Sequence, residues 1–111
     1  MDIVNQQPIK SFDLILTRMM LQHLYFHDIQ KFLHKISQTQ SSYILMTTFS
    51  RTRQNADLQI SEENPGRFRR LNLEIPPLSL TPPLCIQRDG PPREYEGWDH
   101  FIGLWKLPLK Q

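Results

Sequence analysis

The sequence predicts a single α/β domain, and three observations carry that prediction. The chain has 111 residues, 39% of them hydrophobic, which suits one small domain with a folded core. Within residues 12–49, two β-rich apolar runs flank one amphipathic helical segment. All but one of the 9 prolines lie between Pro65 and Pro108, so extended pieces and turns are expected in the second half.

The first expected element is a strand at Phe12–Thr17. Its residues Leu14, Ile15 and Leu16 are consecutive and apolar, a pattern that predicts a strand covered on both faces, as in a parallel sheet. The segment that follows, Arg18–Leu24, is expected to be a loop or a short helical turn.

The next two elements should complete a βαβ unit. Residues 28–37 predict an amphipathic helix, because their apolar positions follow the i, i+3, i+4, i+7 spacing of one helical face: Ile29, Phe32, Leu33 and Ile36. Asp28 in its first turn and Lys35 in its last have the signs that the helix dipole favours. A second β-rich run, Tyr43–Phe49, follows a polar connection, so the two strands should be parallel with a right-handed crossover.

Residues 50–83 are expected to form one long loop. Its first part, up to residue 70, is polar and charged, as in a functional lid or a mobile loop. Its arginines are interleaved with acids, which favours a solvated face over a nucleic-acid site: Arg51, Arg53, Arg67, Arg69 and Arg70. The stretch Leu71–Leu84 alternates apolar residues with Pro-Pro pairs, so it should run extended over the surface.

The last expected elements, within residues 84–108, are the strands Leu84–Arg88 and Phe101–Leu107. A turn-rich stretch with several prolines and glycines separates them, which predicts an antiparallel pair. Trp98 and Trp105 are expected to pack in the core or the strand pair rather than to form a stacking platform.

Several classes of site are excluded by the composition. The first glycine is Gly66, so no Gly-rich phosphate loop exists in the first 65 residues. The single cysteine, Cys85, cannot form an internal disulfide, which fits a reducing compartment, and its apolar neighbours predict a buried position. The first ten residues do not resemble a secretory signal, and no apolar run approaches the ~20 residues of a membrane span. We therefore expect a cytoplasmic protein that makes no membrane contact.

The ordered motifs resemble class I S-adenosylmethionine-dependent methyltransferases. The run Phe12-Asp-Leu-Ile-Leu-Thr-Arg-Met-Met-Leu-Gln-His-Leu24 resembles their fourth strand and following loop, in the form D-L-I-x-x-R-x-x-L-x-H-L. Ser42–Phe49 is similar to their fifth strand, and Arg70–Pro77 with Leu104–Leu107 is similar to the tail of one subgroup, which closes with an antiparallel strand pair. The resemblance maps residues 1–111 onto the last four strands of a seven-stranded Rossmann-like sheet, the C-terminal half of that fold.

The resemblance also implies a cofactor and its contacts. The Gly-rich loop and the acidic residue that hold S-adenosylmethionine in this family would precede this chain, so methyl transfer is implied for a full-length parent and little catalysis for this chain alone. Asp2 and Ile3 fall where the family often has an acidic residue beside the adenine. Thr17 and Arg18 fall at the carboxyl end of a strand, where open α/β sheets bind ligands. The subgroup often has an Asp after this Arg, and here the residue is Met19.

Other interpretations of these residues stay open. His23 is a candidate general base or contact to an unknown methyl acceptor. His23 and His27 share the spacing of metal ligands on a helix, but no Cys or carboxylate cluster accompanies them, so no metal site is expected. Asp2 is equally compatible with a solvated terminal residue, and Arg18 with an ion pair to a nearby acid.

Two non-enzymatic functions are the alternatives. The first is a non-catalytic truncated protein that pairs its open sheet edge with another chain, because an unpaired apolar strand edge invites such pairing. The second is a small module that binds nucleic acid through its basic loop, which the formal net charge of only +2 makes the weaker expectation.

Overall fold

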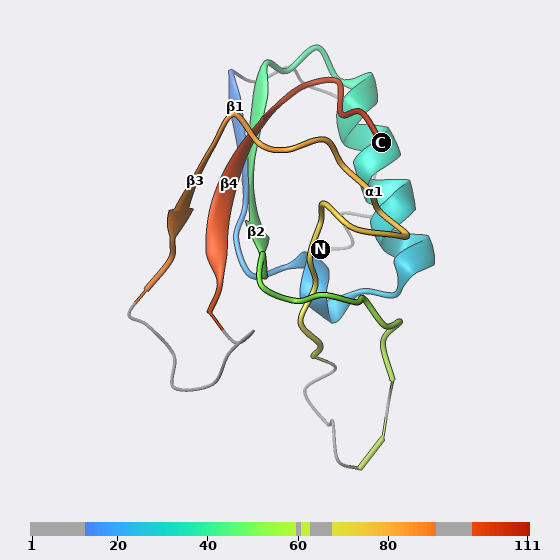
Figure 1. Ribbon diagram of the computed structural model, residues 1–111. Helices are drawn as coiled ribbons and strands as arrows, with labels where there is room; N and C mark the ends of the chain where they lie inside the picture. Colours follow the sequence, from blue (N-terminus) through green and yellow to red (C-terminus); the bar gives the residue numbers. More distant parts are fainter. Residues whose placement is uncertain (1–12, 60, 63–67, 91–98) are drawn as a thin grey trace.

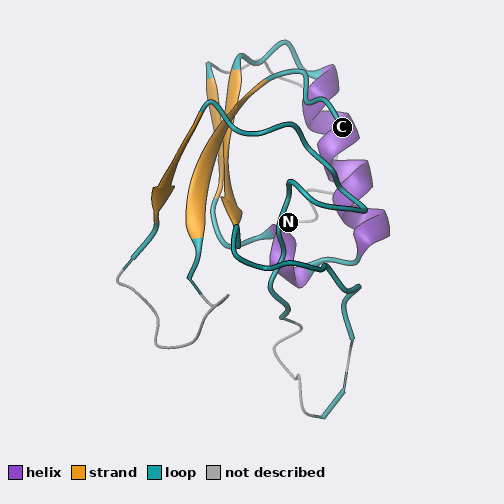
Figure 2. Ribbon diagram, viewed as in Figure 1, coloured by secondary structure: helices purple, strands orange, loops and turns teal. Residues whose placement is uncertain are grey.

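The computed structural model describes residues 13–59, 61–62, 68–90 and 99–111. Along the chain lie β1 (Leu14–Thr17), the 3-10 turn η1 (Leu21–His23), α1 (Phe26–Gln38), β2 (Tyr43–Thr48), β3 (Cys85–Arg88) and β4 (Phe101–Lys106) (Figures 1 and 2). The predicted order of strand, helix, strand and strand pair is confirmed. The helix begins two residues earlier and ends one residue later than its apolar spacing predicted.

The four strands form one mixed sheet in the order β1-β2-β4-β3. β1 and β2 are parallel, as the βαβ pattern predicted, and β4 is antiparallel both to β2 and to β3. It follows that β1, β2 and β3 run in one direction and end on the same side of the sheet, where β4 begins. This side is called the carboxyl end below.

One face of the sheet carries the hydrophobic core. The apolar stripe of α1 is buried there, as its spacing predicted, and Ile29 is fully buried. The stripe belongs to one cluster with side chains of β2 and β4 that alternate along their strands: Ile44, Met46 and Trp105. Figure 1 shows α1 on one side of the sheet, connected to β1 through η1.

The stretch 71–80 lies in this core, so the prediction that it runs over the surface is wrong. Leu71, Leu73, Leu78 and Leu80 are each at most 2% exposed. The segment folds back on itself through the hydrogen bond from the Leu80 amide to the Leu73 carbonyl, 2.9 Å long. It thereby covers the sheet beside α1, on the same face (Figure 1).

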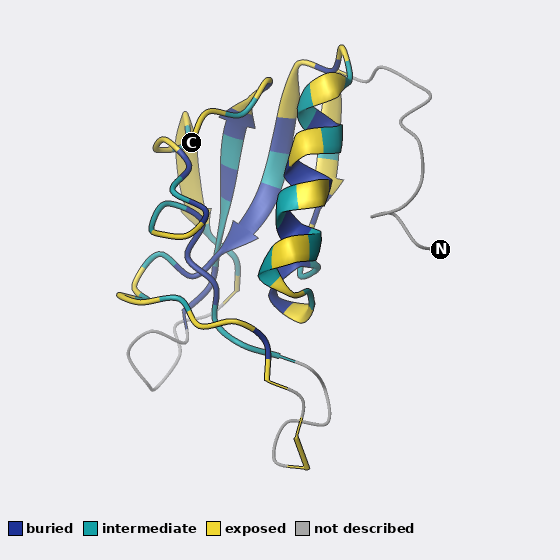
Figure 3. Ribbon diagram, turned by 90° about the vertical axis from the view of Figure 1, so that its right-hand side faces the viewer, coloured by how far each residue is buried: buried dark blue, intermediate teal, exposed yellow. Residues whose placement is uncertain are grey.

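On the opposite face, called the open face, several apolar side chains of the strands stay exposed. Leu14 is 49% exposed and Leu16 60% exposed, so the prediction that this strand is covered on both faces is wrong. Cys85 is also exposed, against the prediction of a buried thiol. The physical reason is that α1 and segment 71–80 both lie on the other side of the sheet (Figure 3).

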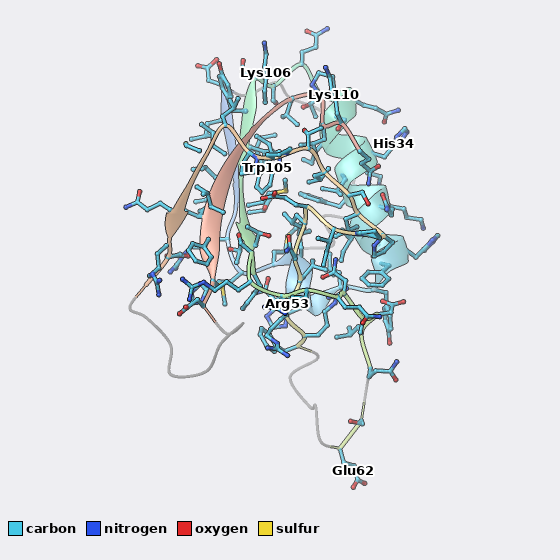
Figure 4. The ribbon with its side chains drawn as sticks, in the orientation of Figure 1. His34, Arg53, Glu62, Trp105, Lys106 and Lys110 are labelled. Carbon is cyan, nitrogen blue, oxygen red and sulfur yellow. The ribbon has the colours of Figure 1, made fainter. Side chains whose placement is uncertain are left out.

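Trp105 occupies the space between the sheet and the segments that cover it (Figure 4). It is 2% exposed and its Nε1 donates a hydrogen bond to the Thr81 carbonyl over 2.8 Å, which confirms its predicted core position. Trp98 lies outside the described residues. Within the described part of the chain, no helix has the length and apolar character to cross a membrane.

Candidate functional site at the carboxyl end of the sheet

The carboxyl end brings together two of the predicted contact residues. Thr17 is the last residue of β1 and is buried, with its hydroxyl donating a hydrogen bond to the Leu45 carbonyl over 3.3 Å. Arg18 follows it and is exposed. The other two predicted contacts, Asp2 and Ile3, lie outside the described residues.

Arg18 pairs with an acid across the sheet. Its Nε and Nη2 donate hydrogen bonds of 2.8 and 3.0 Å to the two carboxylate oxygens of Asp89, which follows β3. Since β1 and β3 are the two edge strands, this ion pair links opposite edges of the sheet. The hydrogen bond from Arg18 holds the pKa of Asp89 below its usual range, against partial burial, and the charges of Arg18 and His100 add to the effect. Of the two interpretations of Arg18, the structure shows the ion pair.

A second acid, Asp99, holds two further arginines. It precedes β4, its side chain is only 4% exposed, and each carboxylate oxygen meets one guanidinium, Arg51 at 2.8 Å and Arg88 at 3.1 Å. Both guanidinium groups also lie against the ring of Phe101, at 5.9 and 5.6 Å from its centroid. Arg51 stays half exposed, and an exposed guanidinium can bind a carboxylate or phosphate.

A row of four aromatic rings crosses the same end of the sheet. His23, at the end of η1, lies 5.9 Å from Phe68, and Phe68 lies 5.9 Å from Phe49 in an edge-on arrangement. Phe49 in turn lies 5.8 Å from His100, the residue before β4. This aromatic row joins His23, the candidate base, to a nearly buried second histidine, and His23 at its other end is exposed.

The long loop is fixed by two asparagines. The Asn55 amide bridges to the Asn72 backbone, accepting from its N–H over 2.8 Å and donating to its carbonyl over 2.7 Å. Asn72 in turn donates to the carbonyls of Ser50 and Thr52 over 3.2 and 2.9 Å. These bonds join two parts of the loop, residues 50–55 and Asn72, beside the carboxyl end. They thereby fix the segment that contains Arg51.

The same loop also holds the start of α1. Asp57 accepts a hydrogen bond from the Phe26 amide over 2.9 Å, in the place of a capping side chain that Tyr25 does not supply. Arg69 donates to the Leu21 and Ala56 carbonyls and lies 5.1 Å over the Phe26 ring. Burial lowers the pKa of Arg69, and the charge of Asp57 opposes that shift.

Sequence reasoning missed most of this site. Asp89 and Asp99 received no role, although Asp89 stands directly after β3 and Asp99 two residues before β4. His100, Phe49 and Phe68 were also missed as a group. The available signal was that polar residues bordering strands meet at one end of an open sheet. To use this signal, one has to know how β3 and β4 join the sheet, and the sequence alone does not show that.

The described residues do not by themselves fit S-adenosylmethionine. The Thr17 hydroxyl donates to a main-chain carbonyl and the Arg18 guanidinium is bound to Asp89. No Gly-rich turn borders the carboxyl end among them; Gly90, the only one of the described glycines with positive φ, follows an edge strand. In the described ranges, no three His, Cys, Asp or Glu side chains gather as a metal site requires.

Comparison with protein-family models, with curated proteins and with solved structures gives no match for this chain.

Proposed function

We propose that this chain is the C-terminal half of a class I S-adenosylmethionine-dependent methyltransferase fold. In the full-length protein, the fold would transfer a methyl group to an acceptor by in-line attack, with the protein orienting the two reactants. The main cofactor contacts would lie on the preceding half, and this chain would contribute the remaining contacts together with the acceptor side of the site.

The topology of the sheet carries this proposal. The resemblance implies two parallel strands joined by a helix and then a terminal antiparallel pair. β1, α1 and β2 have the first arrangement, and β3 and β4 have the second, with β4 next to β2. Each sequence motif is weak alone, whereas this ordered set of elements in one sheet supports the assignment of the whole chain.

The groups at the carboxyl end support an acceptor site there, since open α/β sheets bind ligands beyond the carboxyl ends of their strands. His23 is exposed at the end of the aromatic row and is the candidate general base. Arg51, held by Asp99, is placed to orient an anionic group of the acceptor.

The test is to read the transcript upstream of the Met1 codon, and to express the joined protein where a frame continues. The proposal predicts an in-frame segment with a Gly-x-Gly loop, and a joined protein that binds S-adenosylmethionine in calorimetric titration with micromolar affinity. The 111-residue chain is the matched control and should show no tight binding. An upstream frame without such a loop, or tight binding by the control, would contradict the proposal.

A second candidate function is non-catalytic pairing of the β1 edge with another chain. The observation that favours it is that no described strand pairs with the outer side of β1. Amide hydrogen exchange of residues 14–17 tests it. Slow exchange at the outward-facing amides that depends on protein concentration would support edge pairing, and fast exchange at all concentrations would exclude it.

A further inference from the structure

We propose that the open face of the sheet is a contact surface for a second copy of this chain, packed face to face. This inference does not depend on methyl transfer. It rests on the residues that the strand registers place on the open face, on their charge, and on the size of the face.

The registers place one apolar row across the whole open face. Leu16 of β1 lies opposite Leu45 of β2, Leu45 lies opposite Leu104 of β4, and Leu104 lies opposite Cys85 of β3. Residues directly opposite each other in neighbouring strands point to the same side of a sheet. All four strands therefore contribute an apolar side chain to one continuous stripe.

One of the two neighbouring rows extends this stripe. Towards the other end of the sheet, Leu14 lies opposite Tyr43, and both are exposed, at 49% and 39%. Towards the carboxyl end, Ile102 of β4 is only half-buried, but it lies between the buried Thr47 of β2 and the polar Gln87 of β3, so the exposed apolar stripe ends there. A surface with this many neighbouring apolar side chains is typical of an interface.

The low charge of the open face indicates what kind of partner surface it can bind. Among the strand residues that point this way, Lys106 is the only charged one, and it stands at the last position of β4. An acidic or basic partner would find no row of opposite charges here. A second copy brings the same uncharged apolar stripe, and a two-fold interface requires such a self-complementary surface.

The size of the face sets the strength of the dimer. Two strands of six residues and two of four, at ~4.8 Å spacing and ~3.3 Å per residue, give about 300 Å² in projection, or about 600 Å² for two copies. This lies below the ~1,200 Å² of standard stable interfaces. We therefore expect a reversible dimer with a dissociation constant in the micromolar range.

Face-to-face packing explains the exposed rows better than edge pairing does. Two β1 edges joined around a two-fold axis would extend the sheet but leave the stripe in water on both copies. Packing of two sheets about 10 Å apart removes the stripe from water, as in a β-sandwich. The free energy of apolar burial, about 25 cal/mol per Å², favours the arrangement that covers the stripe.

The first experiment measures mass against concentration by sedimentation equilibrium, from about 1 µM to about 500 µM. The mass should rise from the monomer value of 13.2 kDa towards twice that value. Leu16→Lys should weaken the dimer at least about tenfold, because it brings a charge into the apolar contact. Tyr25→Lys is the matched control: Tyr25 is a 37% exposed apolar side chain outside the sheet, and its substitution should leave the dimer unchanged.

The second experiment uses the native thiol and needs no variant, so it holds even where Leu16→Lys does not fold. Cys85 lies in the apolar row on β3, at the edge of the sheet farthest from β1. In a face-to-face dimer its reaction with a maleimide should slow about tenfold at concentrations where nine-tenths of the chain is dimeric. In a dimer formed through the β1 edges, Cys85 would stay as reactive as in the monomer.

Three results would overturn the proposal. These are a mass of 13.2 kDa at every concentration, a dimer in which Cys85 stays fully reactive, and growth into assemblies of no fixed size. If the mass stays at 13.2 kDa and Cys85 is nevertheless protected, another part of the same chain covers the face. A concentration-dependent dimer with a protected Cys85, sensitive to Leu16→Lys and insensitive to Tyr25→Lys, would support it.

Discussion

The guanidinium of Arg18 makes its two hydrogen bonds with a residue 71 positions further along the chain. Sequence reasoning placed Arg18 at the carboxyl end of a strand, which the structure confirms, but its partner follows from the fold alone. Asp89 comes close only because β3 joins the sheet through β4 and runs parallel to β1. The pair orders the carboxyl end, and a ligand that uses Arg18 has to compete with Asp89.

Asp89→Asn should lower the melting temperature at pH 7 and have no effect in acid. The pKa of Asp89 is depressed in the folded chain, so its stabilising contribution is complete above the ordinary value of about 3.9. That contribution disappears as the pH falls through the lower, folded-state pKa. Thermal unfolding of both proteins between pH 7 and pH 2 checks this, and a difference that persists at the lowest pH would contradict the pairing. Arg18→Gln should reproduce the same pH dependence.

Gly103 of β4 stands where the Trp105 ring and Pro83 leave no room for a side chain. A Cβ at this position would lie 2.6 and 2.7 Å from ring atoms of Trp105 and 3.3 Å from Cβ of Pro83. The buried Trp105 ring cannot move away without losing its contacts in the core and its hydrogen bond to the Thr81 carbonyl.

Gly103→Ala should therefore destabilise the chain by about 1–3 kcal/mol, the usual cost of overpacking. Urea unfolding followed by Trp fluorescence measures this value. Lys106→Ala, at an exposed position of the same strand, is the control and should change stability by less than about 0.5 kcal/mol. Equal stability of the Gly103 variant and the wild type would show that the ring is not packed as described.

At the scale of elements, the long connection between β2 and β3 covers part of one face of the sheet, as a second helix would. The core beside α1 is filled by the leucines of this connection, Leu71, Leu73, Leu78 and Leu80. The Thr48 hydroxyl accepts a 3.0 Å hydrogen bond from the Leu73 amide. The loop is irregular but closely bonded, because Asn55 and Asn72 satisfy main-chain groups that a helix would satisfy internally.

Asn72→Ala should destabilise the chain by about 1–3 kcal/mol, since it leaves main-chain carbonyls of the loop without their donor. Chemical denaturation gives the value, and amide exchange should accelerate in residues 50–55 before it does in α1. Gln54→Ala removes an exposed amide from the same loop and is the matched control, with no expected change. A similar loss in both variants would mean that the asparagine network is not what holds the loop.

The elements with a regular period could be predicted from the sequence, and the irregular ones could not. The spacing of Ile29 to Ile36 located α1 within two residues at each end, and the apolar runs located all four strands. The stretch 71–80 was misplaced because Pro-Pro pairs indicate an extended surface segment, whereas here Pro76 and Pro77 stand in the turn of a segment whose leucines are buried. Of the candidate site, Thr17, Arg18 and His23 could be located locally, but their partners depend on long-range strand order.

For the molecule as a whole, the main feature is a sheet with one covered face and one open face. The strand order brings Arg18, Asp89 and Asp99 to one end, and the register lines up Leu16, Leu45 and the rest of the apolar row on the open side. Both the methyltransferase proposal and the dimer proposal depend on the position of β4 between β2 and β3.

Nuclear Overhauser effects between backbone protons of an isotope-labelled sample test that position most directly. The fold predicts parallel cross-strand contacts between β1 and β2 that follow the pairing of Leu16 with Leu45. It predicts antiparallel contacts between β2 and β4 that follow the pairing of Leu45 with Leu104. Contacts that pair β2 with β3 instead, or the absence of any between β1 and β2, would contradict the fold and with it both proposals.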